Sequence, residues 1–143
     1  MADDAQSNKV VVERFIRDGR DRATGRWDMQ VIREVFDVDR YFSHSWGGDL
    51  AETGRRMGQY FSAFEFLELL NDDFVAENDF VIHRASARVR HAGDVFGVAA
   101  TNRVLTVHTV EIWRLENGKI IEHWGGAGDG RNLYEQITAD EER

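Results

Sequence analysis

The amino-acid sequence predicts an α+β fold in which helices cover one face of a curved antiparallel sheet. In the first half of the chain, apolar residues recur at the three- and four-residue steps of amphipathic helices. After Asn71 the pattern changes to runs rich in β-branched and aromatic residues, which favour strands. The chain has 13 glycines and no proline, so its turns must be made by Gly and Asn, as in β-hairpins. Helices followed by strands are typical of the α+β class.

The helical part has three candidate segments, each with apolar side chains along one face: residues 8–18, 29–36 and 55–70. Ser7 is a candidate N-cap of the first helix, and Gly19 is its expected end. Between the second and third helices, residues 41–46 alternate aromatic and polar side chains before a Gly-Gly pair. We therefore expect a short strand there.

Four further strands are expected, at residues 74–77, 80–91, 104–115 and 120–124. Asn117-Gly118 separates the last two, and both residues tolerate the positive φ angles of a type I′ turn. We interpret residues 1–143 as a single domain with a charged, frayed tail at residues 140–143.

Composition and charge exclude several functions. The 18 basic and 26 acidic residues give a formal net charge of −8, which repels the phosphate backbone of nucleic acids. The chain has no apolar run long enough to cross a membrane, and its start is acidic, unlike a signal peptide. We therefore expect a cytoplasmic protein that binds neither nucleic acid nor membranes.

The absence of cysteine excludes disulfides, thiolate nucleophiles and cysteine zinc sites. Any chemistry must then use oxygen or nitrogen groups. Of the histidines, His83, His91, His108 and His123 do not stand at the i, i+4 spacing of a helical metal site. No metal is expected.

Several short motifs resemble, in their order and spacing, those of the SnoaL-like polyketide cyclases. They are Ala63-Phe64, Glu77-Asn78-Asp79, His91-Ala92-Gly93 with Phe96-Gly97 and Thr101, the run Gly-Lys-Ile-Ile-Glu-His-Trp at residues 118–124, and Asp129 with Leu133 and Gln136. This family is a branch of the cone-shaped α+β fold, also called nuclear transport factor two-like or cystatin-like, that ketosteroid isomerase shares. The resemblance implies a cofactor-free enzyme of secondary metabolism with a deep pocket between the helices and the concave face of the sheet. It also implies a homodimer formed through the convex face.

Glu111 is the first candidate catalytic residue. It lies in the middle of a predicted strand, where alternation puts Thr109, Glu111 and Trp113 on one face. Its position resembles the place of a carboxylic acid in ketosteroid isomerase and of a histidine in aldol-type cyclases. A carboxyl group enclosed by apolar side chains retains its proton more readily and can donate it near neutral pH. The alternative is inverted alternation, with Glu111 facing solvent or a partner's arginine.

His44 is the second candidate, at a position that resembles the general base of ketosteroid isomerase and a common histidine of the cyclases. Imidazole titrates near neutrality and can take a proton from a carbon next to a carbonyl group. The alternative is a histidine bonded to a backbone carbonyl at the end of a strand. Together, His44 and Glu111 would place a base and an acid on opposite walls of the pocket.

Two departures from the family pattern, at Gly125 and Phe15, and one match, at Asp129, bear on the reaction. Gly125 stands where the aldol cyclases have an aspartate after the last strand. Asp129 matches a later aspartate of the family, and we interpret it as a helix cap in preference to a catalytic group. Phe15 replaces the tyrosine with which ketosteroid isomerase holds the enolate. These differences favour ring closure by a route other than the aldol reaction, giving an ether, a carbocycle or a cycloaddition product, and disfavour ketosteroid isomerisation.

The candidate substrate-binding residues share an aromatic or polar side chain on a predicted inner face: Phe15, Phe42, Trp46, Tyr60, His91, Thr109, Trp113 and His123. They would line a pocket for a hydrophobic, polyketide-like molecule, although core packing explains aromatic residues equally well. Trp27 and Trp124 are assigned to packing or to a dimer surface.

Two alternatives to a cyclase are a non-catalytic domain that binds a hydrophobic molecule or a protein partner, and an epoxide-hydrolase-like enzyme. The second would need two carboxylates and an arginine around one water, and Glu111 with Arg88 or Asp94 are the candidates. A carboxyl group in the pocket that no arginine neutralises would favour catalysis over binding alone.

Overall fold

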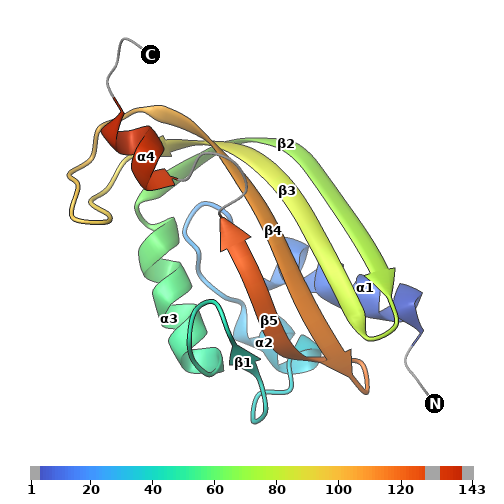
Figure 1. Cartoon of the computed structure of the whole chain (residues 1–143). Helices are drawn as coiled ribbons and strands as arrows, with labels where there is room; N and C mark the ends of the chain where they lie inside the picture. Colours follow the sequence, from blue (N-terminus) through green and yellow to red (C-terminus); the bar gives the residue numbers. More distant parts are fainter. Residues whose placement is uncertain (1–3, 128–132, 140–143) are drawn as a thin grey trace.

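The structure, a computed structural model, describes residues 4–127 and 133–139 (Figure 1). Five strands form one curved sheet in the order β1-β5-β4-β3-β2. They are β1 (Phe42–Ser43), β2 (Phe64–Glu77), β3 (Phe80–His91), β4 (Val104–Glu116) and β5 (Lys119–Ala127). Neighbouring strands from β2 to β5 are antiparallel, and β1 runs parallel to β5. The predicted α+β class is confirmed.

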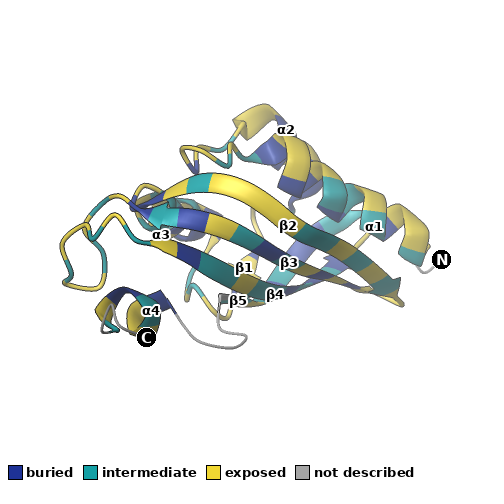
Figure 2. Cartoon of the chain, turned by 90° about the horizontal axis from the view of Figure 1, so that it is seen from above, coloured by how far each residue is buried: buried dark blue, intermediate teal, exposed yellow. Residues whose placement is uncertain are grey.

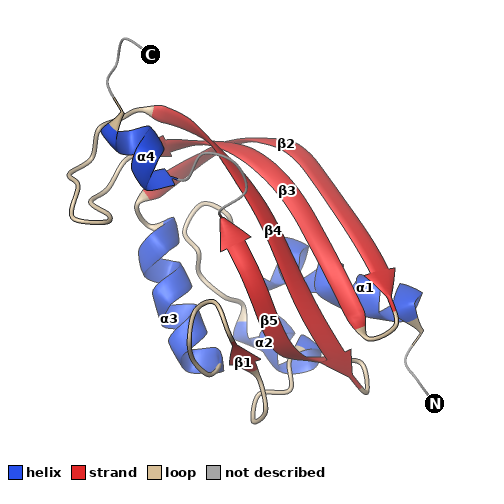
Figure 3. Ribbon diagram, in the orientation of Figure 1, coloured by secondary structure: helices blue, strands red, loops and turns tan. Residues whose placement is uncertain are grey.

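The helical segments are α1 (Ala5–Arg14), a π-helical turn η1 (Phe15–Gly19), α2 (Met29–Val35), α3 (Leu50–Phe61) and α4 (Leu133–Thr138). Figure 2 shows α1 and α2 over one side of the sheet, and Figure 3 shows α3 beside the sheet edge that carries β1. α4 contacts β4 at the end of the sheet far from α1 (Figure 1).

The first helix differs in its start from the prediction. Asp4, and not Ser7, is the N-cap, since its side chain accepts a hydrogen bond from the backbone N–H of Gln6. The helix ends at Gly19 as expected, after a π-helical turn. Such turns are rare and often mark functional sites. Here the turn leads directly into Arg20, which lines the cavity described below.

The predicted helix over residues 55–70 is confirmed as far as Phe61 and is wrong beyond it. α3 begins after the cap Asp49 and ends at Phe61, and β2 begins at Phe64. The cause is two register shifts of β2 against β3, between Phe66 and Glu68 and between Leu69 and Asn71. Each adds a residue to the two-residue alternation of a strand. The apolar residues therefore recur at three-residue steps, which imitates a helix.

The hairpin between β4 and β5 turns at Asn117 and Gly118, whose φ angles are 53° and 74°. Both are positive, as a type I′ turn requires. This confirms the predicted hairpin, which pairs β5 with β4.

The main core lies between α1, α2 and the end of the sheet near the β4–β5 hairpin, with Phe36 at its centre. The Phe36 ring packs edge-on against Phe15 at 4.8 Å and Tyr41 at 4.9 Å, and it stacks on Trp27 at 6.0 Å. The assignment of Trp27 to packing is therefore confirmed. A second, smaller apolar cluster joins the other end of the sheet to α4: Ala63, Phe64, Val89, Leu105, Leu133 and Ile137.

We expect Phe36→Ala to lower the free energy of unfolding by about 3–5 kcal/mol, because it leaves a cavity among aromatic rings. Phe42→Ala is the matched control, since Phe42 is 44% exposed, and should change it by less than about 1 kcal/mol. Urea denaturation measures both values. Equal effects would contradict the placement of this core.

Candidate functional site

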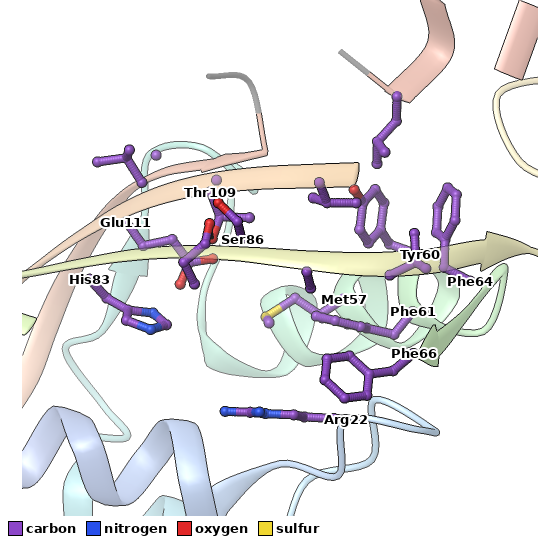
Figure 4. Close-up of a pocket in the computed structure, with 18 of the residues that line it drawn as sticks. Arg22, Met57, Tyr60, Phe61, Phe64, Phe66, His83, Ser86, Thr109 and Glu111 are labelled. Atoms are coloured by element: carbon purple, nitrogen blue, oxygen red, sulfur yellow. Dashed lines mark hydrogen bonds between the residues drawn. The ribbon is translucent and has the colours of Figure 1, made fainter. Parts of the chain in front are cut away.

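A cavity of about 830 Å³ lies between the two apolar clusters, enclosed by the inner face of the sheet, α3, η1 and the start of α4. Figure 4 shows aromatic side chains at one end and His83 and Glu111 at the other. The aromatic wall consists of Tyr60, Phe61, Phe64, Phe66, Phe96 and Tyr134. The cavity therefore has an apolar end and a polar end, as sites for small organic molecules commonly do.

Glu111 lies at the polar end and is only 7% exposed. Val107 and Thr109 from the same strand also line the cavity, while Trp113 lies in the main core. The predicted alternation of β4, with Glu111 inward, is therefore confirmed. Within residues 4–127 and 133–139, no group forms a hydrogen bond or an ion pair with the Glu111 carboxyl group. It is available to a ligand.

The charge of Glu111 influences four other side chains around the cavity. Burial lowers the pKa of Arg20, and the Glu111 carboxylate opposes that change. Burial likewise lowers the pKa of His123, again opposed by Glu111. Burial raises the pKa of Tyr41 and Tyr60, and Glu111 raises it further. Burial is thus the main cause of all four shifts, and Glu111 is a charge that acts on each of them.

Arg20 also lines the cavity, and sequence reasoning did not identify it. Its Nη1 atom is fully enclosed and has no hydrogen-bond partner in the described part of the chain. The guanidinium group lies 5.6 Å from the Phe15 ring centre and 5.2 Å from that of Phe61. Glu111 and Arg20 therefore face the same cavity without pairing directly.

His83 is the second residue that sequence reasoning did not identify. It lies on β3 directly opposite Glu111 on β4 and is 3% exposed. Its Nε2 is hydrogen-bonded to Oδ1 of Asp72 on β2, and its Nδ1 is enclosed without a partner. The alternation of β3 places His83 on the same face as Ala85, but only the pairing of β3 with β4 sets it beside Glu111.

His44 does not face Glu111, so the expected pair on opposite walls is wrong. The His44 Nε2 lies 2.8 Å from Oε2 of Glu122, and the His44 ring stacks on Trp124 on the outer side of the sheet. The reason is alternation along β1: Ser43 points inward, where its Oγ bonds to His123, so the next residue points outward. His44 lies outside the cavity lining.

The remaining predicted binding residues divide into two groups. Three line the cavity: Trp46, Tyr60 and Thr109. Five do not, which corrects the prediction for them: Phe15, Phe42, His91, Trp113 and His123. Phe15 and Trp113 belong to the main core, and Phe42 is exposed. His91 and His123 are buried, and each has a ring nitrogen bonded to a hydroxyl group, that of Thr101 or Ser43.

The residues proposed for an epoxide-hydrolase-like site do not converge. Arg88 is paired with Glu68 at 3.4 Å on the exposed side of the sheet. Asp94 lies in the loop after β3, where it accepts a hydrogen bond from the backbone N–H of Ala100. Neither lines the cavity.

Gly125, which stands where the aldol cyclases have an aspartate, lies opposite Glu111 and lines the cavity. Its φ angle is +95°, and a Cβ atom there would collide with the carbonyl oxygen of Val110. Its N–H donates a hydrogen bond to Ser45 Oγ at 2.6 Å. This backbone path leaves no room for an aspartate side chain. The other candidate aspartate, Asp129, lies outside the described residues.

In the described ranges, no three His, Asp or Glu side chains are grouped so that they could hold a metal ion. None of the helices described is both long and apolar enough to span a membrane.

Comparison with known proteins gives a consistent result. The model of the SnoaL-like polyketide cyclase family matches residues 26–137. TsrD from Streptomyces laurentii is 23% identical with a TM-score of 0.74, over 96% of this chain and 98% of its own. AclR from Streptomyces galilaeus, a "putative hydroxylase", is 24% identical with a TM-score of 0.69, over 94% and 82%. A "putative SnoaL-like polyketide cyclase" from Jannaschia sp. CCS1 is 22% identical with a TM-score of 0.70, over 94% and 92%. No match to this chain is found among curated proteins.

We expect Gly125→Ala to destabilise the fold more than Gly126→Ala. Both residues have positive φ, which costs an alanine about 1–3 kcal/mol. Only at Gly125 does the new Cβ also collide with the backbone, because nothing lies within 4 Å of a Cβ at Gly126. Urea denaturation midpoints compare the two variants. Equal midpoints would contradict the close approach of β4 and β5 at Gly125.

Proposed function

Because the chain belongs to the SnoaL-like polyketide cyclase family, we propose that it is an enzyme that closes a ring on a polyketide-derived intermediate without a cofactor. The observation that carries this proposal is the unpaired, buried carboxyl group of Glu111 at the polar end of a largely aromatic cavity. A domain that only bound apolar molecules would gain nothing from a carboxyl group that lacks a partner, because burying it is unfavourable.

The cavity would first act by shape. A flexible chain loses conformational freedom when its apolar part is held against the aromatic wall, and this brings its reacting carbon atoms together before the reaction. Ring closure onto a C=C bond conjugated with a carbonyl group moves an electron pair onto the carbonyl oxygen. Glu111 would donate a proton to that oxygen as the negative charge develops.

The ring would be formed by a route other than the aldol reaction of the family. The support is Gly125, whose backbone conformation leaves no space for the carboxylate that those cyclases carry there. Ether formation, carbocycle formation through a conjugated acceptor and cycloaddition all rearrange bonds without a metal or redox step, so the product has the mass of the substrate.

The outer face of the sheet supports the proposal of a homodimer. A row of apolar side chains crosses four paired strands, consisting of Val75, Ile82, Ile112 and Trp124. Val75 is 61% exposed and Ile82 is 38% exposed. Contact between two such faces would remove these side chains from water.

We expect Glu111→Gln to reduce turnover on the order of 100-fold, the usual scale for a lost general acid. Stability should be unchanged or slightly higher, because the amide keeps the shape of the side chain and cannot ionise in the buried site. Turnover is followed by liquid chromatography and mass spectrometry with polyketide thioesters that carry a conjugated enone, as a new product of unchanged mass. Binding of these thioesters, measured by tryptophan fluorescence, should persist.

Glu122→Gln is the matched control for this experiment, since Glu122 pairs with His44 and Arg114 outside the cavity. It should leave turnover intact. Normal turnover in Glu111→Gln would remove Glu111 from the chemistry. Binding without turnover in the unmodified protein would instead favour a non-catalytic binding domain.

We expect sedimentation analysis to give a dimer, twice the 16.4 kDa of one chain. Ile82→Glu should produce monomers, because it places a charge in the middle of the apolar row. Val10→Glu, at a 58% exposed position on α1, should remain dimeric. A monomeric unmodified protein would contradict the proposed interface.

A further inference from the structure

We infer that His83, oriented by Asp72, is the base of this cavity, and that its Nδ1 takes a proton from a carbon atom next to a ligand carbonyl group. The inference rests on the proposed function and deepens it, because it names the residue that would act as the base. Three observations carry it: the bond between His83 and Asp72, the free ring nitrogen, and the position of Glu111 on the adjacent strand.

The bond to Asp72 determines which nitrogen of His83 is basic. An ionised carboxylate can only accept hydrogen bonds, so Nε2 carries the hydrogen that Asp72 accepts. In the neutral ring, the lone pair then lies on Nδ1. Asp72 also forms an ion pair with Arg17, at 3.6 Å from its guanidinium group. Asp72 is a positioning residue in this arrangement.

The ring of His83 is held in place from both sides. It stacks on Phe74, with ring centres 4.3 Å apart and an angle of 16° between the planes, and it lies 6.2 Å from the Trp113 ring centre. His83 is among the residues that line the cavity, and its Nδ1 has no partner within residues 4–127 and 133–139. A histidine that only linked β2 to β3 would need the Nε2 bond alone. The enclosed, unpaired Nδ1 points to a ligand.

Two further groups complete the site. Glu111 is the cross-strand neighbour of His83, so a base and an acid come from adjacent strands and not from opposite walls. Arg20 contributes an enclosed Nη1 that has a hydrogen to donate. A carbonyl oxygen bound there would be stabilised as it becomes an enolate oxygen.

The step balances without any further reactant. The Nδ1 of His83 takes the proton, the C–H electron pair forms the C=C bond of an enolate, and the carbonyl oxygen bound by Arg20 carries the negative charge. The enolate carbon then bonds to an electrophilic carbon of the same chain, and the displaced π electrons finish on an oxygen that Glu111 protonates. His83 gains one proton and Glu111 loses one, and solvent restores both.

Deuterium exchange tests the first half of this step on its own. The probe is 2-tetralone, an apolar bicyclic ketone that the aromatic wall can accommodate. In D2O, loss of its C1 proton signal in the NMR spectrum measures proton removal directly. The unmodified protein should accelerate the exchange in a saturable manner. His83→Gln should reduce that rate on the order of 100-fold, while 2-tetralone still quenches tryptophan fluorescence and the melting temperature is unchanged.

His44→Gln is the matched control. His44 is also bonded to a carboxylate, that of Glu122, but it lies on the outer side of the sheet. It should exchange 2-tetralone at the rate of the unmodified protein. Asp72→Asn should lower the maximal exchange rate and leave the half-saturating concentration unchanged, and Asp72→Glu should restore part of the rate. If Asp72 had a purely structural role, its substitution would not lower the maximal exchange rate while leaving the half-saturating concentration unchanged.

The inference is overturned if His83→Gln exchanges as fast as the unmodified protein, or if Glu111→Gln abolishes the exchange and His83→Gln does not. It is also overturned if the unmodified protein binds 2-tetralone without accelerating the exchange. In that case, cyclisation of the enone-containing polyketide thioesters would leave the proposed function standing. Exchange in Glu111→Gln at the normal rate supports the inference, because proton removal does not require the acid.

Discussion

The antiparallel register of β3, β4 and β5 determines which of their side chains reach the cavity. It sets His83, Glu111 and Gly125 in one row across the inner face of the sheet. Because side chains alternate along a strand, a shift of one residue in any pairing would turn one of them to the outer face. The Asn117-Gly118 turn fixes one of these pairings.

The cavity exists because the two apolar clusters do not meet. Helices α1 and α2 pack on one end of the inner face and α4 on the other, while the register shifts of β2 alter its course between them. The polar residues of the cavity lie at the boundary of the main core. Arg20 is among them and follows the π-helical turn directly in the sequence. Packing therefore produces both the space for a ligand and its division into an apolar and a polar end.

Local patterns predicted most of the fold but only part of the site. The change of period, the Asn-Gly turn and the alternation around Glu111 are properties of neighbouring residues, and each was confirmed. The bulged start of β2 was not predictable in this way, because its irregular alternation resembles helical spacing. His83 and Arg20 depend on contacts between distant segments, so no local signal distinguishes His83 from the other histidines. The prediction for His44 is wrong because the face to which side chains of a two-residue strand point is determined by its pairing with β5.

The electrostatics of the cavity separate it from an ordinary core. Buried ionisable side chains are normally paired, as His83 is with Asp72. Glu111 and Arg20 face the same space and remain unpaired among the described residues, although direct contact would relieve the unfavourable burial of both. The strand register and the aromatic contacts of Arg20 hold these groups in place. A ligand with a carbonyl oxygen and an acidic hydrogen would form hydrogen bonds with the unpaired atoms of Arg20, His83 and Glu111 together. A preorganised site binds its ligand in this way, through polar groups that have no partner in the protein itself.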